Sequence, residues 1–300
     1  MSSQVRRFLE PKTVSELRNM ELIARMIVEG FMAGLHRSPF HGFSAEFSEY
    51  RPHNPGESAR DVDWKAYART DRHYVKLFEE ETNLRATLLL DSSRSMEFSG
   101  SRDRIRKDRY ASLLAAGLAW LLVRQQDAVG LMTFDEKIRE ILPPRSSRSH
   151  LYEILRTLQN NESGGQTDLG EILHRAAERV RRRGLIVLLS DLMDEPEKVL
   201  AGLKHLRHRG HEVLVFHILD PLELDLDLEN ELQLKDLETG EEIRSHPRFL
   251  RETMRNRVAE WRRQLERECR SHRIDYLPIE TDLDFDLALR RILDARRRRS

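Results

Sequence analysis

The sequence predicts an α/β protein built on a doubly wound, mostly parallel sheet. Two nearly continuous apolar runs, LIVLLS at 185–190 and VLVFHIL at 213–219, are typical of strands that are buried on both faces. Strand and helix patterns alternate from residue 86 onward, and such alternation indicates a parallel sheet covered by helices on both sides. A third observation, the runs at 128–134 and 137–142 joined by a tight Asp135-Glu136 turn, predicts one antiparallel edge strand.

A separate segment precedes this alternation. Apolar residues recur at helical spacing from Leu17 to Phe31, so we expect a helix over residues 13–35. Residues 38–71 are rich in aromatic residues, Pro, Gly and His, which favours an ordered loop region with short strands, and residues 74–79 alternate like an edge strand. We therefore expect an N-terminal helical and strand segment, 1–83, packed on a core domain at 84–298.

The core domain contains the expected sheet and its helices. Further strands are expected at 86–90 and 274–279, and helices at 103–124, 148–159, 168–182, 195–207, 247–270 and 284–295. An acidic insertion at 222–246 interrupts the alternation, and the residues Glu238 to Glu241 at its centre indicate a hairpin turn. We expect this insertion to form an accessory surface.

Charge and cysteine content exclude several classes of protein. The 51 Lys and Arg residues balance 51 Asp and Glu residues, which argues against nucleic-acid binding because phosphate contacts require a basic excess. Cys269 is the only cysteine, so an internal disulfide and a cysteine-based metal cluster are excluded. The N-terminus MSSQVRRFLEPK lacks the apolar core of a signal peptide, and no run approaches the ~20 apolar residues of a membrane span. We expect a cytoplasmic protein.

Oxygen-bearing side chains follow two of the predicted strands. Asp91, Ser93 and Ser95 come at every second position after strand 86–90, and Asp191 follows strand 185–190. Thr167 stands just before a helix, after two glycines have turned the chain. Ligands of open α/β sheets bind at the carboxyl ends of the strands, so these five residues are expected to meet there. Hydroxyl and carboxylate oxygens suit a hard cation, Mg²⁺ or Mn²⁺. In the alternative interpretation, the two serines cap the following helix and Asp91 orients a turn.

These five residues resemble the metal-ion-dependent adhesion site of von Willebrand factor type A domains, whose pattern is DxSxS, then Thr, then Asp. The wider text resembles the bacterial domain-of-unknown-function family 58, in particular GFSAEFSEYRPHNPGESARDVDWKAYART, VKLFEEETN, LLLDSSRSM, LQLKDLETGEEI and RIDYLPIETD. His53 and Glu57 depart from that family's pattern.

The resemblance implies how the site is used. Ser93, Ser95 and Thr167 would bind Mg²⁺ or Mn²⁺ directly, while Asp91 and Asp191 would act largely through waters. A Glu or Asp of a client protein would complete the metal site, and no covalent chemistry would follow. A MoxR-type AAA+ ATPase is the implied collaborator in chaperone-like maturation or assembly of other proteins. We also expect Arg94 and Met96 to shape the partner contact.

Other functions have weaker support in the sequence. The chain has no GxSxG elbow, P-loop or GxGxxG, so serine hydrolase, NTPase and dinucleotide-binding functions lack a motif. A metal-dependent phosphoester hydrolase using Asp91 and Asp191 remains an alternative, although no His or third acid nearby supplies a general base. His205, His208 and His211 are expected in a basic, solvated helix end rather than a zinc site. His217 is expected to be a hydrogen-bonded core residue.

The block DVDWKAYAR around Trp64 leaves two interpretations open. Its aromatic residues and mixed charges suit a small platform tied by ion pairs, and a partner surface is the functional alternative.

Overall fold

A computed structural model describes residues 11, 19–35, 50–52, 74–76, 84–101, 103–224, 232–235, 242–245 and 247–297. The chain divides into two compact units, one made of Met1–Gly34 with Leu84–Ser300 and the other of Leu35–Asn83. The helical part of the expected 1–83 segment therefore belongs with the core, and the remainder is a unit of its own. In that second unit, β1 (Tyr50–Pro52) pairs antiparallel with β2 (Tyr74–Lys76). The block around Trp64 lies outside the described residues.

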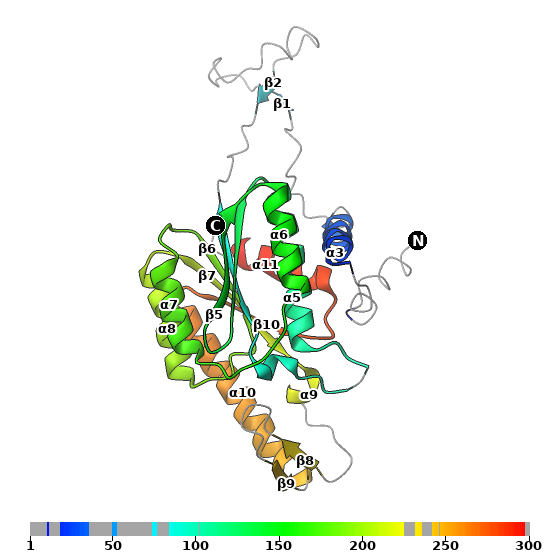
Figure 1. The fold of residues 1–300 in the computed structure, drawn as a ribbon, viewed down its shortest axis with the longest axis vertical. Coiled ribbons are helices and arrows are strands. Elements are labelled where there is room, and N and C mark those ends of the chain that lie inside the picture. The colour runs from blue at the N-terminus through cyan, green and yellow to red at the C-terminus, as the bar shows by residue number, and fades with distance from the viewer. Residues whose placement is uncertain are drawn as a thin grey trace. The chain divides into compact units, whose positions relative to one another are not determined.

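The core unit is built on a six-stranded sheet in the order β10-β7-β6-β3-β4-β5 (Figure 1). The strands are β3 (Arg85–Asp91), β4 (Ala128–Phe134), β5 (Ile138–Arg145), β6 (Leu185–Ser190), β7 (Glu212–Leu219) and β10 (Asp275–Glu280). Every neighbouring pair is parallel except β4 and β5, so the predicted α/β fold with one antiparallel edge strand is confirmed. The chain runs from β3 to β4 on one side and later to β6 on the other. The topological switch point therefore lies between β3 and β6.

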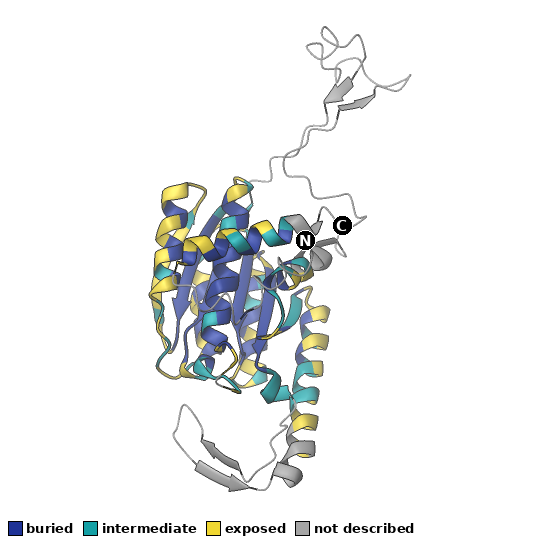
Figure 2. Cartoon of the chain, turned by 90° about the vertical axis from the view of Figure 1, so that its right-hand side faces the viewer, coloured by how far each residue is buried: buried dark blue, intermediate teal, exposed yellow. Residues whose placement is uncertain are grey.

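Helices cover both faces of this sheet. Helices α5 (Lys107–Arg124), α6 (Arg148–Gln159) and α11 (Phe285–Arg297) lie on one face, and α7 (Leu169–Arg179), α8 (Pro196–His208) and α10 (Pro247–Ser271) lie on the other (Figure 1). Figure 2 shows the strands buried and the outer sides of the helices exposed. Because each strand has helices on both sides, it carries apolar residues almost without interruption. All six residues of β6 are buried.

Shorter elements follow two of the strands and make up part of the insertion. A 3₁₀ helix, η2 (Arg94–Glu97), follows β3, and α9 (Pro221–Leu224), which we did not predict, follows β7. Strands β8 (Leu232–Lys235) and β9 (Glu242–Ser245) pair antiparallel, which agrees with the predicted hairpin; its expected turn, 238–241, lies outside the described residues.

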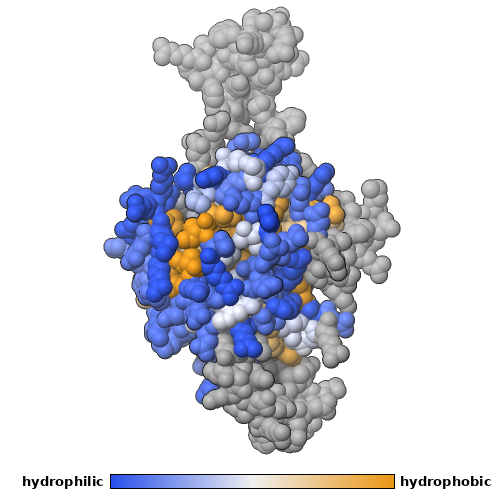
Figure 3. All heavy atoms as spheres, in the orientation of Figure 1, coloured by the Kyte–Doolittle hydropathy of each residue, from blue (hydrophilic) through white to orange (hydrophobic). Residues whose placement is uncertain are grey.

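The edge strand β5 is longer than the predicted 137–142 and includes Pro143 and Pro144. Proline is tolerated here because an edge strand has one side without ladder hydrogen bonds. Figure 3 shows a mostly hydrophilic face with hydrophobic residues gathered between α6 and α7, on the β5 side of the sheet. Ile141 of β5 is 40% exposed. The prolines leave this edge with fewer free N–H groups for pairing with another chain.

Helix α3 (Met20–Leu35) belongs to the core unit and coincides with the later part of the helix predicted over residues 13–35. Residues 13–18 of that predicted helix lie outside the described residues. None of the described helices is long and apolar enough to cross a membrane. Ile27 of α3 is fully buried, and a Cβ on Gly117 of α5 would lie 2.9 Å from its Cγ2 atom. The two helices approach closely because residue 117 has no side chain.

We expect Gly117→Val to lower the free energy of unfolding by about 1–3 kcal/mol, because the new side chain overlaps Ile27 and forces the helices apart. Urea denaturation monitored by circular dichroism measures this loss. The double variant Gly117→Val/Ile27→Ala should regain part of it, since the overlapping Cγ2 atom is removed. A double variant whose loss equals the sum of the two single losses would contradict this packing.

Candidate metal centre

Two buried carboxylates stand at the switch point of the sheet. Strands β3 and β6 pair in parallel register up to Leu90 and Leu189, so the residues that follow leave the sheet together. Asp91 and Asp191 are each 1% exposed. The structure thus brings both predicted acids to the same edge, where α9 also lies (Figure 1).

The turn after β3 presents its hydroxyls to one another. The backbone N–H of Ser93 donates a hydrogen bond to Asp91 Oδ1 at 2.9 Å, and the Oγ atoms of Ser93 and Ser95 lie 3.1 Å apart. Ser93 occupies the N-cap position of η2 but its side chain makes no capping hydrogen bond. Asp91 does orient the turn, as the alternative interpretation required, whereas the hydroxyl of Ser93 contacts the Ser95 hydroxyl and does not cap a backbone N–H of η2.

The loop that carries Thr167 is joined to this turn by backbone hydrogen bonds. Gly164 N–H donates to the carbonyl of Ser92 at 2.9 Å, and Arg94 N–H donates to the carbonyl of Gly165 at 3.0 Å. The Thr167 Oγ1 atom is buried and has no hydrogen-bond partner among the described residues. Asp168 already caps helix α7 by accepting from Glu171 N–H, so the Thr167 hydroxyl is free of that role.

An arginine that the sequence did not reveal holds this loop in place. The Arg139 guanidinium donates to the carbonyls of Glu162 at 2.5 Å and Gly164 at 3.1 Å, and its Nε donates to Asp135 Oδ2 at 2.8 Å. Gly165 adopts a φ of 75°, and a Cβ there would lie 2.8 Å from Asp135 Oδ2. Glycine permits both this backbone conformation and the close approach.

The environment of Asp91 disfavours its ionised form. Burial and the neighbouring Asp191 carboxylate raise the pKa of Asp91 to about 7, although hydrogen bonds from Ser190 and Ser93 oppose this shift. Ser190 Oγ donates to Asp91 Oδ2 at 2.6 Å. Both oxygens of Asp91 therefore accept a hydrogen bond, and Ser190 is a site residue that we did not predict. Its place directly before Asp191 at a strand end was the available signal.

A buried lysine, also unpredicted, supplies positive charge to the site. Lys107 Nζ lies 2.8 Å from Asp191 Oδ2 and 2.6 Å from Glu223 Oε1, and its side chain is 1% exposed. Burial acts to lower the pKa of Lys107, but the two carboxylates raise it above its usual value. Burial likewise acts to raise the pKa of Asp191, yet Lys107 and further hydrogen bonds hold it below its usual range. Lys107 is thus charged and keeps Asp191 ionised.

The donor set fits a hard cation and does not fit zinc. Among the described residues, no group of three or more His, Cys, Asp or Glu could hold a metal ion. The ends of β3 and β6 and the loop before α7 instead offer three hydroxyls and two carboxylates, which are oxygen ligands of the kind that Mg²⁺ and Mn²⁺ take. A buried hydroxyl without a partner is costly. The orphaned Thr167 Oγ1 would gain a partner if a cation were bound.

Two expectations about neighbouring residues need correction. Met96 is fully buried and therefore cannot contact a partner; Arg94 is exposed, and Met193, at 51% exposure, is the exposed methionine at this edge. His211 is buried and hydrogen-bonds the carbonyl of Val180, so the expected solvated helix end does not include it. His217 is a core residue as predicted, because its Nδ1 pairs with the Tyr276 hydroxyl and burial lowers its pKa to about 3.

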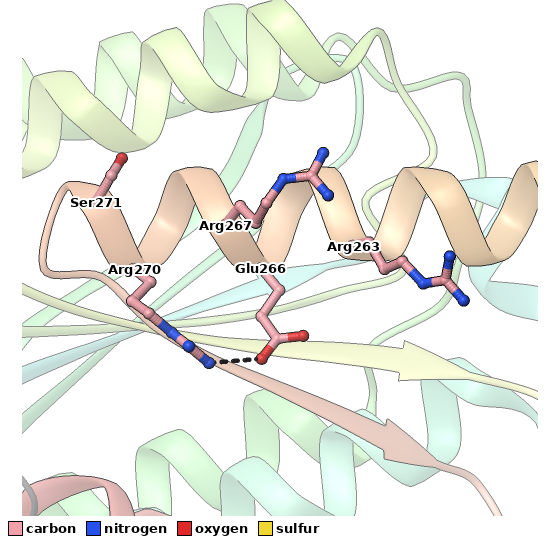
Figure 4. Close-up of a pocket in the computed structure, with 5 residues that line it drawn as sticks. All are labelled: Arg263, Glu266, Arg267, Arg270 and Ser271. Atoms are coloured by element: carbon pink, nitrogen blue, oxygen red, sulfur yellow. Dashed lines mark hydrogen bonds and ion pairs between the residues drawn. The ribbon is translucent and has the colours of Figure 1, made fainter.

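Two surface hollows lie outside the strand ends. One, of about 400 Å³, is lined by Arg263, Glu266, Arg267, Arg270 and Ser271 of α10, and Arg270 pairs with Glu266 at 2.9 Å (Figure 4). The other, of about 560 Å³, adjoins the Thr167 loop and includes Arg106, Asp108 and Ser163 in its lining. Neither hollow contains the five predicted residues.

The six-stranded, mostly parallel sheet with helices on both faces and carboxylates at its switch point defines the class as an open, doubly wound α/β domain. A family model described as "Protein of unknown function DUF58" matches residues 49–268, and the chain belongs to this family.

Several known proteins are similar to this chain over half or more of its length. The chain is 28% identical over 294 residues to "Uncharacterized protein Rv1480" of Mycobacterium tuberculosis, covering 96% of this chain and 91% of the relative. It is 30% identical over 162 residues to "Uncharacterized protein MAV169" of Mycobacterium avium, covering 52% and 94%. Among solved structures, the conserved hypothetical protein BatB from Bacteroides thetaiotaomicron matches with a TM-score of 0.46 and 19% identity over 71% of this chain and 99% of BatB. The SpRpn10 VWA domain matches with a TM-score of 0.40 and 12% identity, covering 69% and 94%.

In the metal-free protein we expect Asp91 to contribute a loss of stability as the pH rises from about 4 to about 7, because native Asp91 retains its proton in this range whereas the unfolded carboxyl does not. Buried His217, whose pKa is lowered to about 3, contributes a slope of opposite sign that is common to the wild type and the variants. The lowered pKa of Asp191 has its effect below this window, where stability is lost as the pH falls. Asp91→Asn should remove the loss between these pH values and raise the free energy of unfolding at about pH 8 by roughly 1–3 kcal/mol.

Urea denaturation in EDTA across this pH range measures the effect. Asp282→Asn, which removes an exposed carboxylate, is the matched control and should follow the wild type. Equal pH slopes for wild type and Asp91→Asn would show that Asp91 is not protonated in the native state.

Proposed function

We propose that this chain is a protein–protein interaction module whose partner contact depends on Mg²⁺ or Mn²⁺. The observation that carries the proposal is the buried hydroxyl of Thr167, which has no hydrogen-bond partner in the described part of the chain. Its loop is joined by backbone hydrogen bonds to the turn that follows Asp91. Burying a hydroxyl without a hydrogen-bond partner lowers the stability of the fold, and so does burying two carboxylates close together. A divalent cation would remove both costs, since it would accept the hydroxyl as a ligand and balance the two acids.

The existing hydrogen bonds indicate which residues would bind the cation directly and which would bind it through water. Asp91 already accepts from Ser93 N–H and Ser190 Oγ, and Asp191 accepts from Lys107 Nζ and Met193 N–H. The two carboxylates are therefore placed to hold metal-bound waters. Ser93, Ser95 and Thr167 would be the direct protein ligands. A cation held mainly by neutral hydroxyls remains electrophilic and would take a carboxylate oxygen from another protein.

The partner that fits this chemistry is a client protein that presents a Glu or Asp. Arg94 and Met193 are exposed beside the strand ends and offer a charged and an apolar contact around such a carboxylate. We further propose that a MoxR-type AAA+ ATPase acts with this chain in the maturation or assembly of the client, which follows from the family resemblance.

Hydrolysis of a phosphoester is the second candidate, suggested by the same pair of acids. It would need a general base near the cation. His217 is the buried histidine near Asp191, but its Nδ1 is engaged by Tyr276 and its pKa of about 3 makes it a weak base. Lys107 is held in its charged form by its two carboxylates. Partner binding is therefore the better supported function.

We expect Mg²⁺ to stabilise the wild type, by about 2.7 kcal/mol at a hundredfold excess over Kd, because it would bind the native state only. Thr167→Val should abolish this response without lowering stability in EDTA, since the variant removes a buried hydroxyl that has no partner. Thermal unfolding in EDTA and in Mg²⁺ provides the measurement. Thr87→Val changes a buried threonine on β3 outside the site and should keep the full response. A response that survives in Thr167→Val would contradict the proposed ligand set.

We expect the wild type to retain the MoxR-type ATPase or a client in Mg²⁺ and to release it in EDTA, whereas Thr167→Val should not retain it in either buffer. Affinity capture with purified partners provides the readout. Turnover of a generic phosphoester that requires Mn²⁺ and Asp91, without partner retention, would support the hydrolase instead.

A further inference from the structure

Lys107 is a buried lysine beside the candidate metal centre, and the proposed ligand set does not explain it. It lies in the first turn of α5, and its side chain is 1% exposed. Its Nζ atom lies 5.6 Å from the centroid of the Phe98 ring. Its ammonium lies between two carboxylates that come from different strand ends, Asp191 after β6 and Glu223 in α9. An isolated charge is not buried at this depth unless it is paired.

The same ammonium lies where it would oppose a divalent cation. Because it donates a hydrogen bond to Asp191 Oδ2 at 2.8 Å, it would lie near a cation that Asp191 holds through a water. Two positive charges at such a separation repel strongly because the buried surroundings screen them weakly. Without a divalent cation, in contrast, Lys107 is the positive charge that compensates Asp191. The lysine therefore stabilises the metal-free state and weakens the metal-bound state.

Glu223 is the second carboxylate that holds the ammonium. Its Oε1 accepts from Lys107 Nζ at 2.6 Å, and its Oε2 accepts from Asp220 N–H at 2.8 Å, which fixes the carboxylate within α9. Asp220 is itself buried and paired with Arg104 at 3.1 Å. The lysine is thus held by Asp191, at the end of β6, and by Glu223 of α9, which precedes the acidic insertion.

We propose that the Lys107 ammonium competes with the divalent cation for Asp191, and that Glu223 limits this competition by holding the ammonium from the opposite side. This inference rests on the proposed metal site and deepens it. Its consequence is that Mg²⁺ binds weakly to the free chain and tightly once a partner carboxylate adds negative charge. Lys107 is a positioning residue in this scheme and touches neither the metal nor the partner.

Titration of the full chain with Mg²⁺ alone tests the competition, with Mg²⁺ binding measured by calorimetry and by the shift in thermal unfolding. Lys107→Met should bind Mg²⁺ about tenfold more tightly than the wild type, a change equivalent to about 1.4 kcal/mol. Glu223→Gln should bind Mg²⁺ more weakly, because the ammonium then has Asp191 as its only carboxylate. In the Lys107→Met background, Glu223→Gln should have a smaller effect than in the wild type, which a double-mutant cycle measures.

The double variant Lys107→Met/Glu223→Gln removes both charges together. It tests the proposal if Lys107→Met alone fails to fold. Under the proposal it binds Mg²⁺ more tightly than Glu223→Gln; equal or weaker binding would overturn the competition. If the wild type shows a Mg²⁺ response that Thr167→Val abolishes, but Lys107→Met binds no more tightly, this inference alone fails. If the wild type shows no Thr167-dependent response, the proposed metal site fails first.

Discussion

The burial of two like charges at neighbouring strand ends is the constraint on which this structure depends. Asp91 and Asp191 leave a parallel sheet at its switch point, where helices on both faces exclude solvent. Two carboxylates cannot both ionise there without compensation. The chain meets this constraint in different ways at the two positions. Asp191 has the Lys107 ammonium, while Asp91 has hydrogen-bond donors and a pKa raised to about 7. An imbalance of charge is thus built into the site and favours a cation.

The rest of the edge is arranged around this pair. The turn after β3 is shaped by the hydrogen bond from Ser93 N–H to Asp91, and the Thr167 loop is joined to that turn through two backbone hydrogen bonds. Arg139 holds the same loop from the side of the antiparallel hairpin. The backbone that carries the hydroxyls is therefore held by contacts that do not use the hydroxyls themselves. Such preorganisation suits a binding site, because the ligands need not be ordered when the cation arrives.

The sequence was most informative where a residue's environment is set by its own segment. The bounds of β4 and β6 match the predicted ranges, because continuous apolar runs end where solvent or a turn begins. The five candidate residues could be found because parallel strands place their ends at one edge. Lys107 and Glu223 could not, since each meets its partner only through the fold, at separations of 84 and 116 residues. Helix α9 is too short to show a periodic pattern.

The most direct test is the location of Mn²⁺ by anomalous X-ray scattering from crystals of the chain grown with and without Mn²⁺. A cation coordinated by Ser93, Ser95 and Thr167 would give an anomalous peak among their hydroxyl oxygens, with Asp91 and Asp191 in its outer shell. The peak should be lost in Thr167→Val crystals. A fully ordered strand edge without a peak at high Mn²⁺ concentration, or a peak at another place only, would contradict the metal site and with it the proposed mode of partner binding.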